Sequence, residues 1–549
     1  MNHSKYRAFP PVNLPDRTWP GKQITHAPEW CSVDLRDGNQ ALEVAMSLEQ
    51  KLEFFTFLTK VGFKTIEVGF PAASDTEFEF TRKLIDDKLV PDGVAIQVLT
   101  QSREHIIART FEALEGAKKA IVHLYNSTST LQRDVVFRKS KDEIKALAVS
   151  GAEQVLALAE QHGRERFLFE YSPESFTGTE LDYALEVCNA VLDVWKPSAQ
   201  YPVIINLPST VEMATPNVYA DQIEYICRHI KYREHVVISL HAHNDRGTGV
   251  AATELAVMAG ADRVEGTLFG NGERTGNADI LTLALNLFSQ GIDPELDFTD
   301  IDKVVEIYER MTKLDVHPRH PYAGYLVFTA FSGSHQDAIK KGIDALPADK
   351  AQWEVPYLPI DPMDVGRSYA PIIRINSQSG KGGVAYILET FFGLRLPKDM
   401  QPDFSKIVTA VSDTSHKELL PEELYQLFRA EYVNLEAPLS LLGYAEKANG
   451  MTAVTSTLTV RGEEKQITGE GEGIIDAFAH SLQNALGIRF EIVDYSEHSM
   501  EYGQKSRAIT YVCIKDDAGR KVFGAGLSSS ISKSSLKAVV SAVNRMLGE

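Results

Sequence analysis

Cysteine is scarce in this sequence. Four cysteines are spread over 549 residues, and no two of them form a CxxC pair. Scattered thiols of this kind exclude a disulfide framework and a zinc ribbon, and they indicate reduced cysteines in a cytoplasmic protein. The four are Cys31, Cys188, Cys227 and Cys513.

Long apolar runs are also lacking. No stretch approaches the roughly 18 apolar residues of a membrane-spanning helix. The first 27 residues are polar and rich in proline, and they contain no apolar segment that resembles a signal peptide. We therefore expect a chain with no membrane partner and no secretory leader.

Positive charge is in deficit. The 56 lysines and arginines face 75 acidic residues, which gives a net charge of −19. An acidic surface of this size argues against non-specific binding to nucleic acid or to an anionic membrane. It does not exclude a small anionic substrate, because the field inside a site is set by the residues that line it.

The composition that remains is that of an ordinary globular protein. Hydrophobic residues make up 44% of the chain and charged residues 24%, which excludes a disordered or collagen-like chain. At about 150 residues per domain, the length suggests roughly three or four domains.

Short β-rich apolar runs alternate with amphipathic helical segments from residue 29 onward. Eight such units in about 265 residues match the size of one (β/α)8 TIM barrel, although a doubly wound open sheet is the alternative. The predicted strands are Trp30–Asp34, Thr65–Phe70, Val94–Thr100, Ala120–Tyr125, Phe167–Tyr171, Val203–Leu207, Val236–Ala242 and Arg263–Phe269.

Polar residues gather where nearly every predicted strand ends, and this favours the barrel. In a barrel the carboxyl ends of the strands form one ring around one pocket, whereas in an open sheet they are spread along an edge. The polar segments are DLRDGNQ, HLYN, EYSPES, NLPST, HAHND and GNGERTGN.

Four regions are expected along the chain: an irregular arm over residues 1–28, the α/β barrel over 29–300, helical linker subdomains over 301–431, and an α+β domain over 432–549. In the linker, SQSGKGGVAYIL faintly resembles a phosphate loop. It lacks the Walker spacing and a Ser or Thr after Lys381, so a loop-to-helix turn is the favoured interpretation.

The last region contains an internal repeat. RGEEKQITGEG and DDAGRKVFGAG each combine strand, charged turn, strand and Gly-x-Gly before a helix, and Gly469 and Gly471 recur 55 residues later at Gly524 and Gly526. Two ββα copies should pack together, because one copy cannot bury its own apolar face. The repeat suits a dimerisation module and an effector-binding module equally well.

A metal site is suggested by His241-x-His243 at the end of a predicted strand. Side chains at i and i+2 of a strand share a face, so both imidazoles can meet one ion, although a lone HxH pair is more often structural. Asp37 after the first strand and Asn277 after the eighth add oxygen ligands. Such a mixed set suits Mg²⁺, Mn²⁺ or Zn²⁺ and leaves positions open for a substrate.

Other strand-end residues complete the candidate site. Arg36 precedes Asp37 and suits a carbonyl oxygen that gains negative charge, with a surface salt bridge as the alternative. Glu273 lies among glycines that let backbone approach a ligand, and it is a candidate base or relay. His123, Glu174 and Thr210 are candidates for hydrogen bonds to a small acid.

These motifs resemble the 2-isopropylmalate synthase family of the longer bacterial and fungal type, within the DRE-TIM metallolyase superfamily. The resemblance rests on DLRDGNQAL, HAHNDRGTGVA, FGNGERTGN, GSHQDAIKKG and VPYLPIDPMDVGRSYAPIIRINSQSGKGGVAYIL, and it runs from about residue 5 to the end. It implies an acyltransferase that joins acetyl-CoA to 2-oxoisovalerate and releases 2-isopropylmalate and CoA, the first committed step of leucine synthesis.

The resemblance also implies roles for individual residues. Asp37, His241 and His243 would hold a divalent metal, most plausibly Mg²⁺, with Asn277 as a further ligand; a monovalent cation is an additional activator to test. Arg36 would stabilise the alkoxide. The oxo acid would be bound by His123, Glu174 and Thr210. In a homodimer, His335 of the partner subunit would act as base with Glu273. Tyr357 would couple the domains, and leucine would bind the turns around Gly471, Gly473 and Gly526.

Related barrels and departures from the pattern leave alternatives open. A hydroxymethylglutaryl-CoA lyase is disfavoured because none of the four cysteines lies in a loop after the last strands, and a biotin-dependent carboxyltransferase because no Met-Lys-Met signal is present. Homocitrate or citramalate synthase, and an effector-binding barrel without activity, remain alternatives.

The first Gly-rich turn carries Glu472 and Ile474 where the family usually has Asn and Pro, and Ser530 replaces an Asn in the second, so weaker leucine inhibition is expected.

Overall fold

The computed structural model describes residues 1–330, 333–346, 352–369, 381–415, 419–500 and 506–548. The chain forms two compact units. The first contains Met1–Val327 and Ile339–Ser368, and the second contains Phe328–Ala338 and Tyr369–Glu549. The predicted helical region is therefore divided between the two units.

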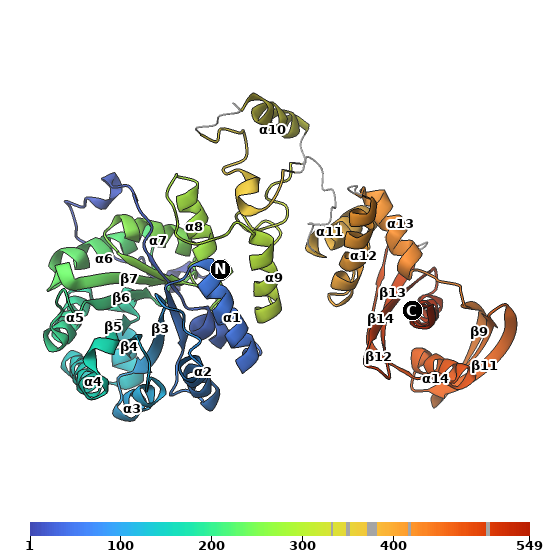
Figure 1. The fold of residues 1–549 in the computed structure, drawn as a ribbon, viewed down its shortest axis with the longest axis horizontal. Coiled ribbons are helices and arrows are strands. Elements are labelled where there is room, and N and C mark those ends of the chain that lie inside the picture. Colours follow the sequence, from blue (N-terminus) through green and yellow to red (C-terminus); the bar gives the residue numbers. More distant parts are fainter. Residues whose placement is uncertain (331–332, 347–351, 370–380, 416–418, 501–505, 549) are drawn as a thin grey trace. The chain divides into compact units, whose positions relative to one another are not determined.

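The first unit contains a closed barrel of eight parallel strands in chain order, with β1 paired to β8. This confirms the predicted TIM barrel and excludes the open sheet. Its strands are β1 Glu29–Ser32, β2 Thr65–Gly69, β3 Ala95–Gln101, β4 Ala120–Ser127, β5 Phe167–Glu174, β6 Val203–Ser209, β7 Val236–Ala242 and β8 Arg263–Gly266. Strands β3–β7 are labelled in Figure 1.

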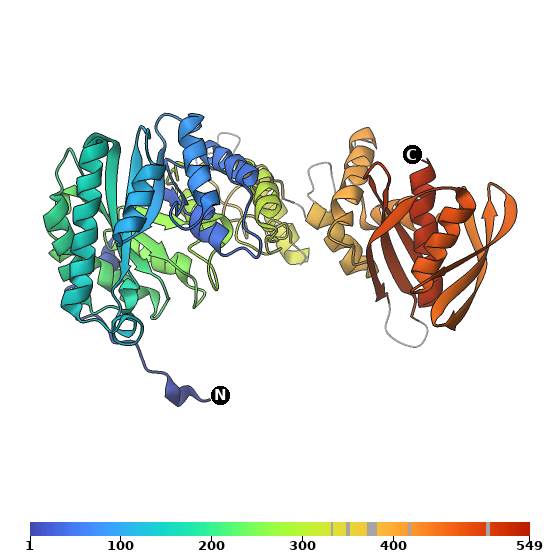
Figure 2. The same cartoon turned by 90° about the horizontal axis from the view of Figure 1, so that it is seen from below.

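Helices cover the outer side of the barrel (Figure 1, Figure 2). The first begins after a capping box between Ser47 and Gln50, ends at Gly62 with φ +118°, and buries Phe54 and Leu58. The helices are α1 Leu48–Val61, α2 Asp75–Asp86, α3 Glu104–Ala113, α4 Lys141–His162, α5 Leu181–Trp195, α6 Pro216–His229, α7 Gly249–Met258, α8 Ile280–Phe288 and α9 Ile301–Thr312.

Two strands end earlier than the apolar pattern predicted. β8 stops at Gly266 because the chain turns at Leu268–Gly270, where Phe269 has φ +58°. Gly266 itself lies against the next segment, since a Cβ there would be 2.5 Å from the carbonyl oxygen of Ala278. β1 stops at Ser32 because the chain enters a short helical segment, Asp34–Gly38. Both corrections place polar residues at the mouth of the barrel instead of inside a strand.

The N-terminal arm is partly fixed to the barrel. Trp19 is buried and its indole Nε1 donates a 2.8 Å hydrogen bond to Asp221 of α6, while the Thr18 hydroxyl donates to Glu224 at 2.5 Å. The first residues, by contrast, extend away from the helices (Figure 2) and are exposed.

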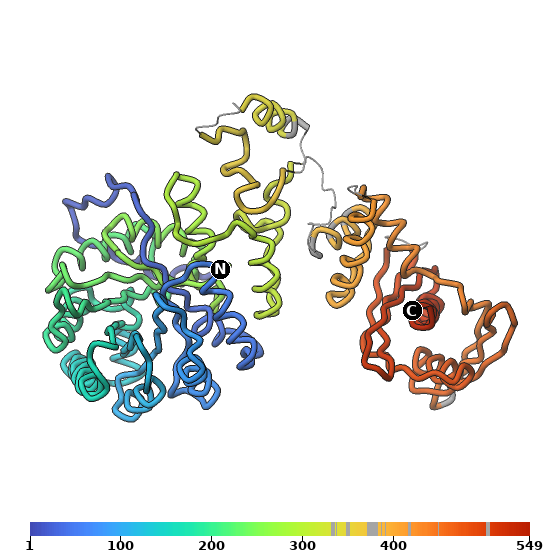
Figure 3. The backbone as a smooth tube through the Cα atoms, viewed as in Figure 1, coloured from blue at the N-terminus to red at the C-terminus, as the bar shows by residue number. Residues whose placement is uncertain are grey.

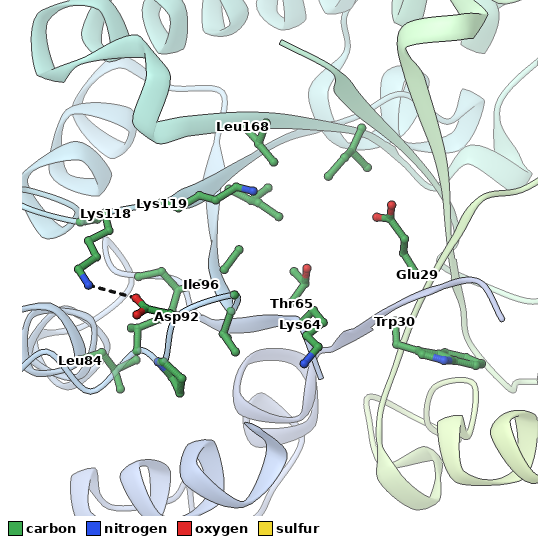
Figure 4. A pocket seen from close by; sticks show the side chains of 18 of the residues that line it. Glu29, Trp30, Lys64, Thr65, Leu84, Asp92, Ile96, Lys118, Lys119 and Leu168 are labelled. Carbon is green, nitrogen blue, oxygen red and sulfur yellow. Dashed lines mark hydrogen bonds and ion pairs between the residues drawn. The ribbon is translucent and has the colours of Figure 1, made fainter. Parts of the chain in front are cut away.

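A cavity of about 730 Å³ lies at the amino ends of the barrel strands (Figure 4). Ala95 and Ile121 are among the residues that line it, and Lys118, which also lines it, pairs with Asp92 at 3.2 Å. None of the predicted site residues lines it. The candidate site therefore lies at the opposite, carboxyl ends of the strands, where TIM-barrel enzymes carry their chemistry.

Helices continue beyond the barrel. Helix α10 Gly333–Ala345 is divided between the two units, and the second unit adds α11 Lys381–Phe392, α12 Met400–Ser415 and α13 Pro421–Tyr432. Residues 377–380 of the phosphate-loop-like segment lie outside the described residues; the helix that follows begins at Lys381. Within the described ranges, every helix is too short or too polar to span a bilayer.

The C-terminal part of the second unit contains two copies of one motif (Figure 3). Each copy has one more strand than predicted: a three-stranded antiparallel sheet followed by a helix. The elements are β9 Leu439–Asn449, β10 Met451–Val460, β11 Glu463–Gly471 and α14 Ile474–Leu486, then β12 Phe490–Ser499, β13 Ala508–Asp516, β14 Lys521–Ser528 and α15 Ile531–Gly548.

The two copies share one hydrophobic core, as the repeat predicted. Val454 and Phe478 of the first copy pack in the same cluster as Val512 and Leu536 of the second. The repeated glycines have a packing role: at Gly471 and Gly526 a Cβ would overlap the backbone of the following helix. Only glycine therefore permits this close approach of helix and strand in each copy.

Candidate active site

Arg36 and Asp37 are held at the mouth of the barrel by the segment Asp34–Gly38. The amide of Gly38 donates to the carbonyl of Val33 at 3.1 Å, which closes a tight turn directly after β1. Asp34 anchors this turn to the loop after β8, because its carboxylate accepts a 3.0 Å hydrogen bond from the amide of Leu268. The turn thereby brings the first and last strands of the barrel to one site.

Asp37, His241 and His243 meet in one buried cluster. Asp37 Oδ2 lies 3.4 Å from His241 Nε2 and 3.7 Å from His243 Nε2. Asn277 joins them, since its Nδ2 donates to Asp37 Oδ2 at 2.8 Å, and Arg36 Nη1 donates to Asp37 Oδ1 at 2.9 Å. The structure therefore brings together all four predicted metal ligands and the predicted catalytic arginine.

The donor set of this cluster fits a divalent cation. Asp37 Oδ2 lies 3.4 and 3.7 Å from the two imidazole Nε2 atoms, which is below the limit of about 4.2 Å for two ligands that are each about 2.1 Å from one ion. The side-chain atoms Asn277 Oδ1 and His243 Nδ1 are buried, and neither has a hydrogen-bond partner among the described residues. An amide oxygen left unpaired beside three potential ligands is consistent with a cation site.

The two histidines have opposite protonation tendencies. Burial disfavours a charged His241, but Asp37 and Glu265 outweigh burial and raise its pKa to about 9. Burial and the neighbouring His241 lower the pKa of His243 to about 4. Burial also pushes the pKa of Asp37 upward, yet Arg36 and His241 hold it well below its usual range. Asp37 is therefore ionised at neutral pH, as a ligand of a cation must be.

Below this cluster lies a buried polar network that the sequence did not indicate. Glu265 Oε2 lies 2.8 Å from His241 Nδ1, so it fixes the ring that presents Nε2 to Asp37. Glu67 contacts Arg36 Nε and also lies 2.7 Å from His123 Nδ1. Arg263 Nη1 donates to Glu265 at 2.9 Å. This network orients the candidate metal ligand His241 and the side chain of Arg36.

Glu67, His123 and Glu265 form a second group with possible ligand atoms, but a glutamine fills its centre. Gln97 Nε2 donates to Glu67 at 2.8 Å and to Glu265 at 2.9 Å. Both carboxylates are therefore already paired inside the protein, whereas Asn277 Oδ1 of the first cluster has no partner among the described residues. Glu170 lies beside this group, 3.3 Å from Arg263 Nη1, and burial together with the nearby Glu265 raises its pKa well above the usual value.

The other predicted site residues of the barrel differ in how deeply they are buried. His123 is buried in the network and its Nε2 lies 2.7 Å from the hydroxyl of Ser172. Glu174, Thr210 and Glu273 are half-buried at the rim. Glu174 accepts from the Ser127 hydroxyl, and Glu273 Oε1 accepts from Gln40 Nε2 at 3.3 Å.

His335 and Tyr357 lie outside this cluster. His335 is an exposed residue of α10 in the second unit, so it is not among the residues that the barrel brings together. Tyr357 belongs to the first unit and is 61% exposed. Of the predicted regulatory glycines, Gly473 is the N-cap of α14, while Gly471 and Gly526 pack against helices.

Comparisons with known proteins agree with this architecture. Three family models match successive parts of the chain: HMGL-like over residues 27–307, alpha-isopropylmalate synthase post-catalytic domain-like over 325–389, and LeuA allosteric (dimerisation) domain over 418–547. The first of these covers the barrel and its polar mouth.

Relatives named 2-isopropylmalate synthase match over the full length. The protein from Acetoanaerobium sticklandii is 60% identical, with 100% of this chain and 97% of the relative covered. Those from Clostridium acetobutylicum and Agrobacterium fabrum are 56% and 55% identical, with 99% of this chain and 99% and 98% of each relative covered. With this identity over the whole chain, and with a closed barrel that carries the Asp37–His241–His243 cluster at its mouth, the chain belongs to the 2-isopropylmalate synthase family.

Proposed function

We propose that this chain condenses acetyl-CoA with 2-oxoisovalerate and hydrolyses the thioester, giving 2-isopropylmalate and CoA in the first committed step of leucine synthesis. The observation that carries the proposal is the buried Asp37–His241–His243 cluster with Arg36 beside it, in a chain of this family. The cluster supplies what an aldol-type addition to a keto acid needs: a cation site, a fixed guanidinium and open space at the mouth.

The proposed ion is Mg²⁺ on Asp37, His241 and His243, with Asn277 as a further ligand and Mn²⁺ or Zn²⁺ as alternatives. A bound divalent cation would polarise the keto group of the oxo acid and so make its carbon electrophilic. The mixed nitrogen and oxygen donors do not select one of these metals.

Arg36 is placed to stabilise the developing alkoxide. Its Nε contacts Glu67 and its Nη1 donates to Asp37, so two sides of the guanidinium are fixed. Its Nη2 makes no hydrogen bond within the described part of the chain. A charged donor that is fixed in place with one N–H group available is suited to an oxygen that becomes negative in the transition state.

Proton transfer is assigned to Glu273 and to His335 of the partner subunit. The base removes a proton from the acetyl-CoA methyl group, the new C–C bond forms at the keto carbon, and the keto oxygen takes up the electron pair and then a proton. Water next adds to the thioester and CoA leaves as the thiol, which draws the reaction forward. His123, Glu174 and Thr210 are proposed to hold the oxo acid.

A panel of 2-oxo acids tests the function. We expect kcat/KM for CoA release to be about tenfold or more higher with 2-oxoisovalerate than with pyruvate, because each additional methyl group in an apolar pocket changes binding by about 10–200-fold. 2-Oxobutyrate should be accepted less well. A thiol reagent that detects CoA provides the measurement.

The outcome of the panel separates the alternatives. A preference for 2-oxoglutarate would make the chain a homocitrate synthase, and a preference for pyruvate would make it a citramalate synthase. No CoA release with any acceptor, in the presence of Mg²⁺ or Mn²⁺, would favour an effector-binding barrel without activity.

The C-terminal domain is proposed to form a homodimer and to bind leucine. It matches a family model described as allosteric and dimerising, and a cavity of about 620 Å³ lies against the start of α14, lined by Gly473, Asp476 and Glu491 among others. The chain is further proposed to act in the cytoplasm, since all four cysteines are free.

Leucine inhibition should be weaker than in relatives with the usual turn. The amide of Glu472 already donates to Asp476 at 3.0 Å, and Glu472 and Asp476 are acidic residues on either side of the start of α14, where a leucine carboxylate would need free N–H groups. Replacing Glu472 by Asn and Ile474 by Pro should lower the leucine concentration for half-inhibition about two- to fivefold.

Inhibition curves on the wild type and on this double variant provide the measurement. The matched control is Glu464→Gln, which removes the same charge from an exposed hairpin strand of the same copy and should leave the curve unchanged. If leucine inhibits the wild type tightly and inhibits the double variant less tightly, the role given to Glu472 is contradicted.

A further inference from the structure

Four loops at the carboxyl ends of β5–β8 are joined by hydrogen bonds that centre on Arg274. Its Nε donates to Asp245 Oδ1 at 2.7 Å and its Nη2 to Asp245 Oδ2 at 3.2 Å. The same Nη2 also donates to the carbonyl oxygen of Thr210. One side chain therefore connects the loop after β8 with the loops after β6 and β7.

Asp245 extends these connections to a second carboxylate. Its Oδ2 accepts a 2.9 Å hydrogen bond from the amide of Glu212, in the loop after β6. The buried carboxylate of Glu212 accepts from the amide of Arg246 at 2.5 Å and from the Thr248 hydroxyl. Each of these two loops therefore donates to the other: the loop after β6 through the amide of Glu212, and the loop after β7 through Arg246 and Thr248.

The loop after β5 is joined through Thr210. The Thr210 hydroxyl accepts a 2.9 Å hydrogen bond from the amide of Ser175, next to Glu174. We call Glu212, Asp245 and Arg274, with the backbone of Thr210, the loop strap. With the Thr210 hydroxyl, which accepts from Ser175, these contacts reach within two residues of three proposed site residues: Glu174, His243 and Glu273.

The loop that carries Arg274 has little freedom of its own. Arg274 adopts φ +57°, a left-handed conformation that a residue with a side chain adopts only when its surroundings hold it there. At Gly276 a Cβ would overlap the carbonyl of Gly270, and at Gly272 it would lie 2.5 Å from Asn277 Nδ2. Gly272 and Gly276 therefore permit a closely packed turn, and the two hydrogen bonds from Arg274 to Asp245 fix this turn to the loop after β7.

We infer that Arg274 is a positioning residue, which sets Glu273 and Thr210 relative to the Asp37–His241–His243 cluster through the loop strap. The inference rests on the proposed function, in which Glu273 transfers a proton and Thr210 holds the oxo acid. The strap is partly open to water: the Arg274 and Asp245 side chains are 42% and 17% exposed. An ion pair of this exposure stabilises a fold little, whereas a shift of about 1 Å in a reacting group lowers a rate about 10²-fold.

A matched arginine at the other end of the same strands gives the control. Arg233 likewise pairs with an aspartate and a backbone carbonyl: its Nη2 lies 3.0 and 3.2 Å from the two carboxylate oxygens of Asp262 and donates to the carbonyl of Gly260 at 3.0 Å. Its side chain is 35% exposed and that of Asp262 41%. The two arginines pair with groups of the same kind, but only Arg274 adjoins the proposed site.

The experiment compares Arg274→Ala with Arg233→Ala in the full-length chain. We expect kcat/KM for 2-oxoisovalerate to fall about 10²-fold in Arg274→Ala, with a lower kcat and a higher KM for the oxo acid, and to change less than about twofold in Arg233→Ala. The Tm values of the two variants should differ from the wild type by similar small amounts. Arg274→Lys should restore part of the activity, because lysine keeps the charge but lacks the fork.

Hydrogen–deuterium exchange separates this inference from the proposed function. Arg274→Ala should speed exchange in residues 210–215 and 244–248, and Arg233→Ala should not. Equal activity, or equal exchange in those residues, for the two alanine variants would overturn the positioning role. A wild type that releases no CoA would instead overturn the proposed function, while the exchange comparison would still decide whether the strap holds the loops.

Discussion

Replacing Asp37 with Asn should lower the rate of CoA release by about 10³-fold or more. The carboxylate is the point where His241, His243, Asn277 and Arg36 converge, with Oδ2 facing both imidazoles. Asparagine keeps the shape but removes the negative charge that a cation needs. Loss of a bound cation removes several kcal/mol of transition-state stabilisation, and each 1.36 kcal/mol is a tenfold change in rate.

Metal content and activity should fall together in this variant and in His241→Ala and His243→Ala. The fold should survive, because the ligands lie at the mouth and the barrel strands remain paired; circular dichroism and Tm check this. The matched control is Asp92→Asn, an exposed carboxylate at the opposite end of the barrel, which should retain wild-type turnover. Near-normal turnover by chelator-treated wild type would remove the metal from the mechanism.

Replacing His335 with Ala should lower activity about 10²- to 10⁴-fold, the range for loss of a general base. If His335 serves the barrel of the partner subunit, inactive His335→Ala and inactive Asp37→Asn chains should complement each other when mixed. A hybrid dimer then has one barrel with Asp37 intact that receives an intact His335 from its partner. Random exchange makes about half of the dimers hybrid, so about a quarter of wild-type activity should return.

The measurement is CoA release before and after exchange, with hybrid formation followed by two different affinity tags. The control mixes His335→Ala with a second His335→Ala preparation, in which no intact base exists and no activity should return. Confirmed exchange without recovery would show that His335 does not act across the dimer.

The barrel and its mouth were predictable from the sequence because both leave local signals. Strand runs such as Val236–Ala242 are apolar and end in charged residues, and His241 and His243 share a face by their spacing alone. Closure of the barrel then brings Asp37 beside them, although they are about 200 positions apart in the chain.

The buried network could not be predicted in the same way. Glu67 and Glu265 stand inside short apolar runs, where a single acid has no local feature that names its partner. Their partners Gln97 and His241 come from other strands, and Arg36 comes from the turn after β1, so the contacts are fixed only once the sheet is closed. An acid in the middle of a predicted barrel strand is the one signal that would have suggested such a network.

The additional strand of each C-terminal copy was missed for a different reason. β9 and β12 lie at the outer edges of their sheets, and β12 alternates apolar and charged residues with most of its side chains exposed or half-buried. Such strands resemble polar loops. The repeated glycines marked only β11 and β14, because those strands approach the helices most closely.

The shared core of the C-terminal copies has a consequence for how this part of the chain melts. Val454 and Phe478 from one copy, and Val512 and Leu536 from the other, belong to a single buried cluster. When one half unfolds, the other loses part of its buried apolar core, so neither half can remain folded alone. The two halves should therefore unfold together, in one cooperative transition whose calorimetric enthalpy equals its van't Hoff enthalpy.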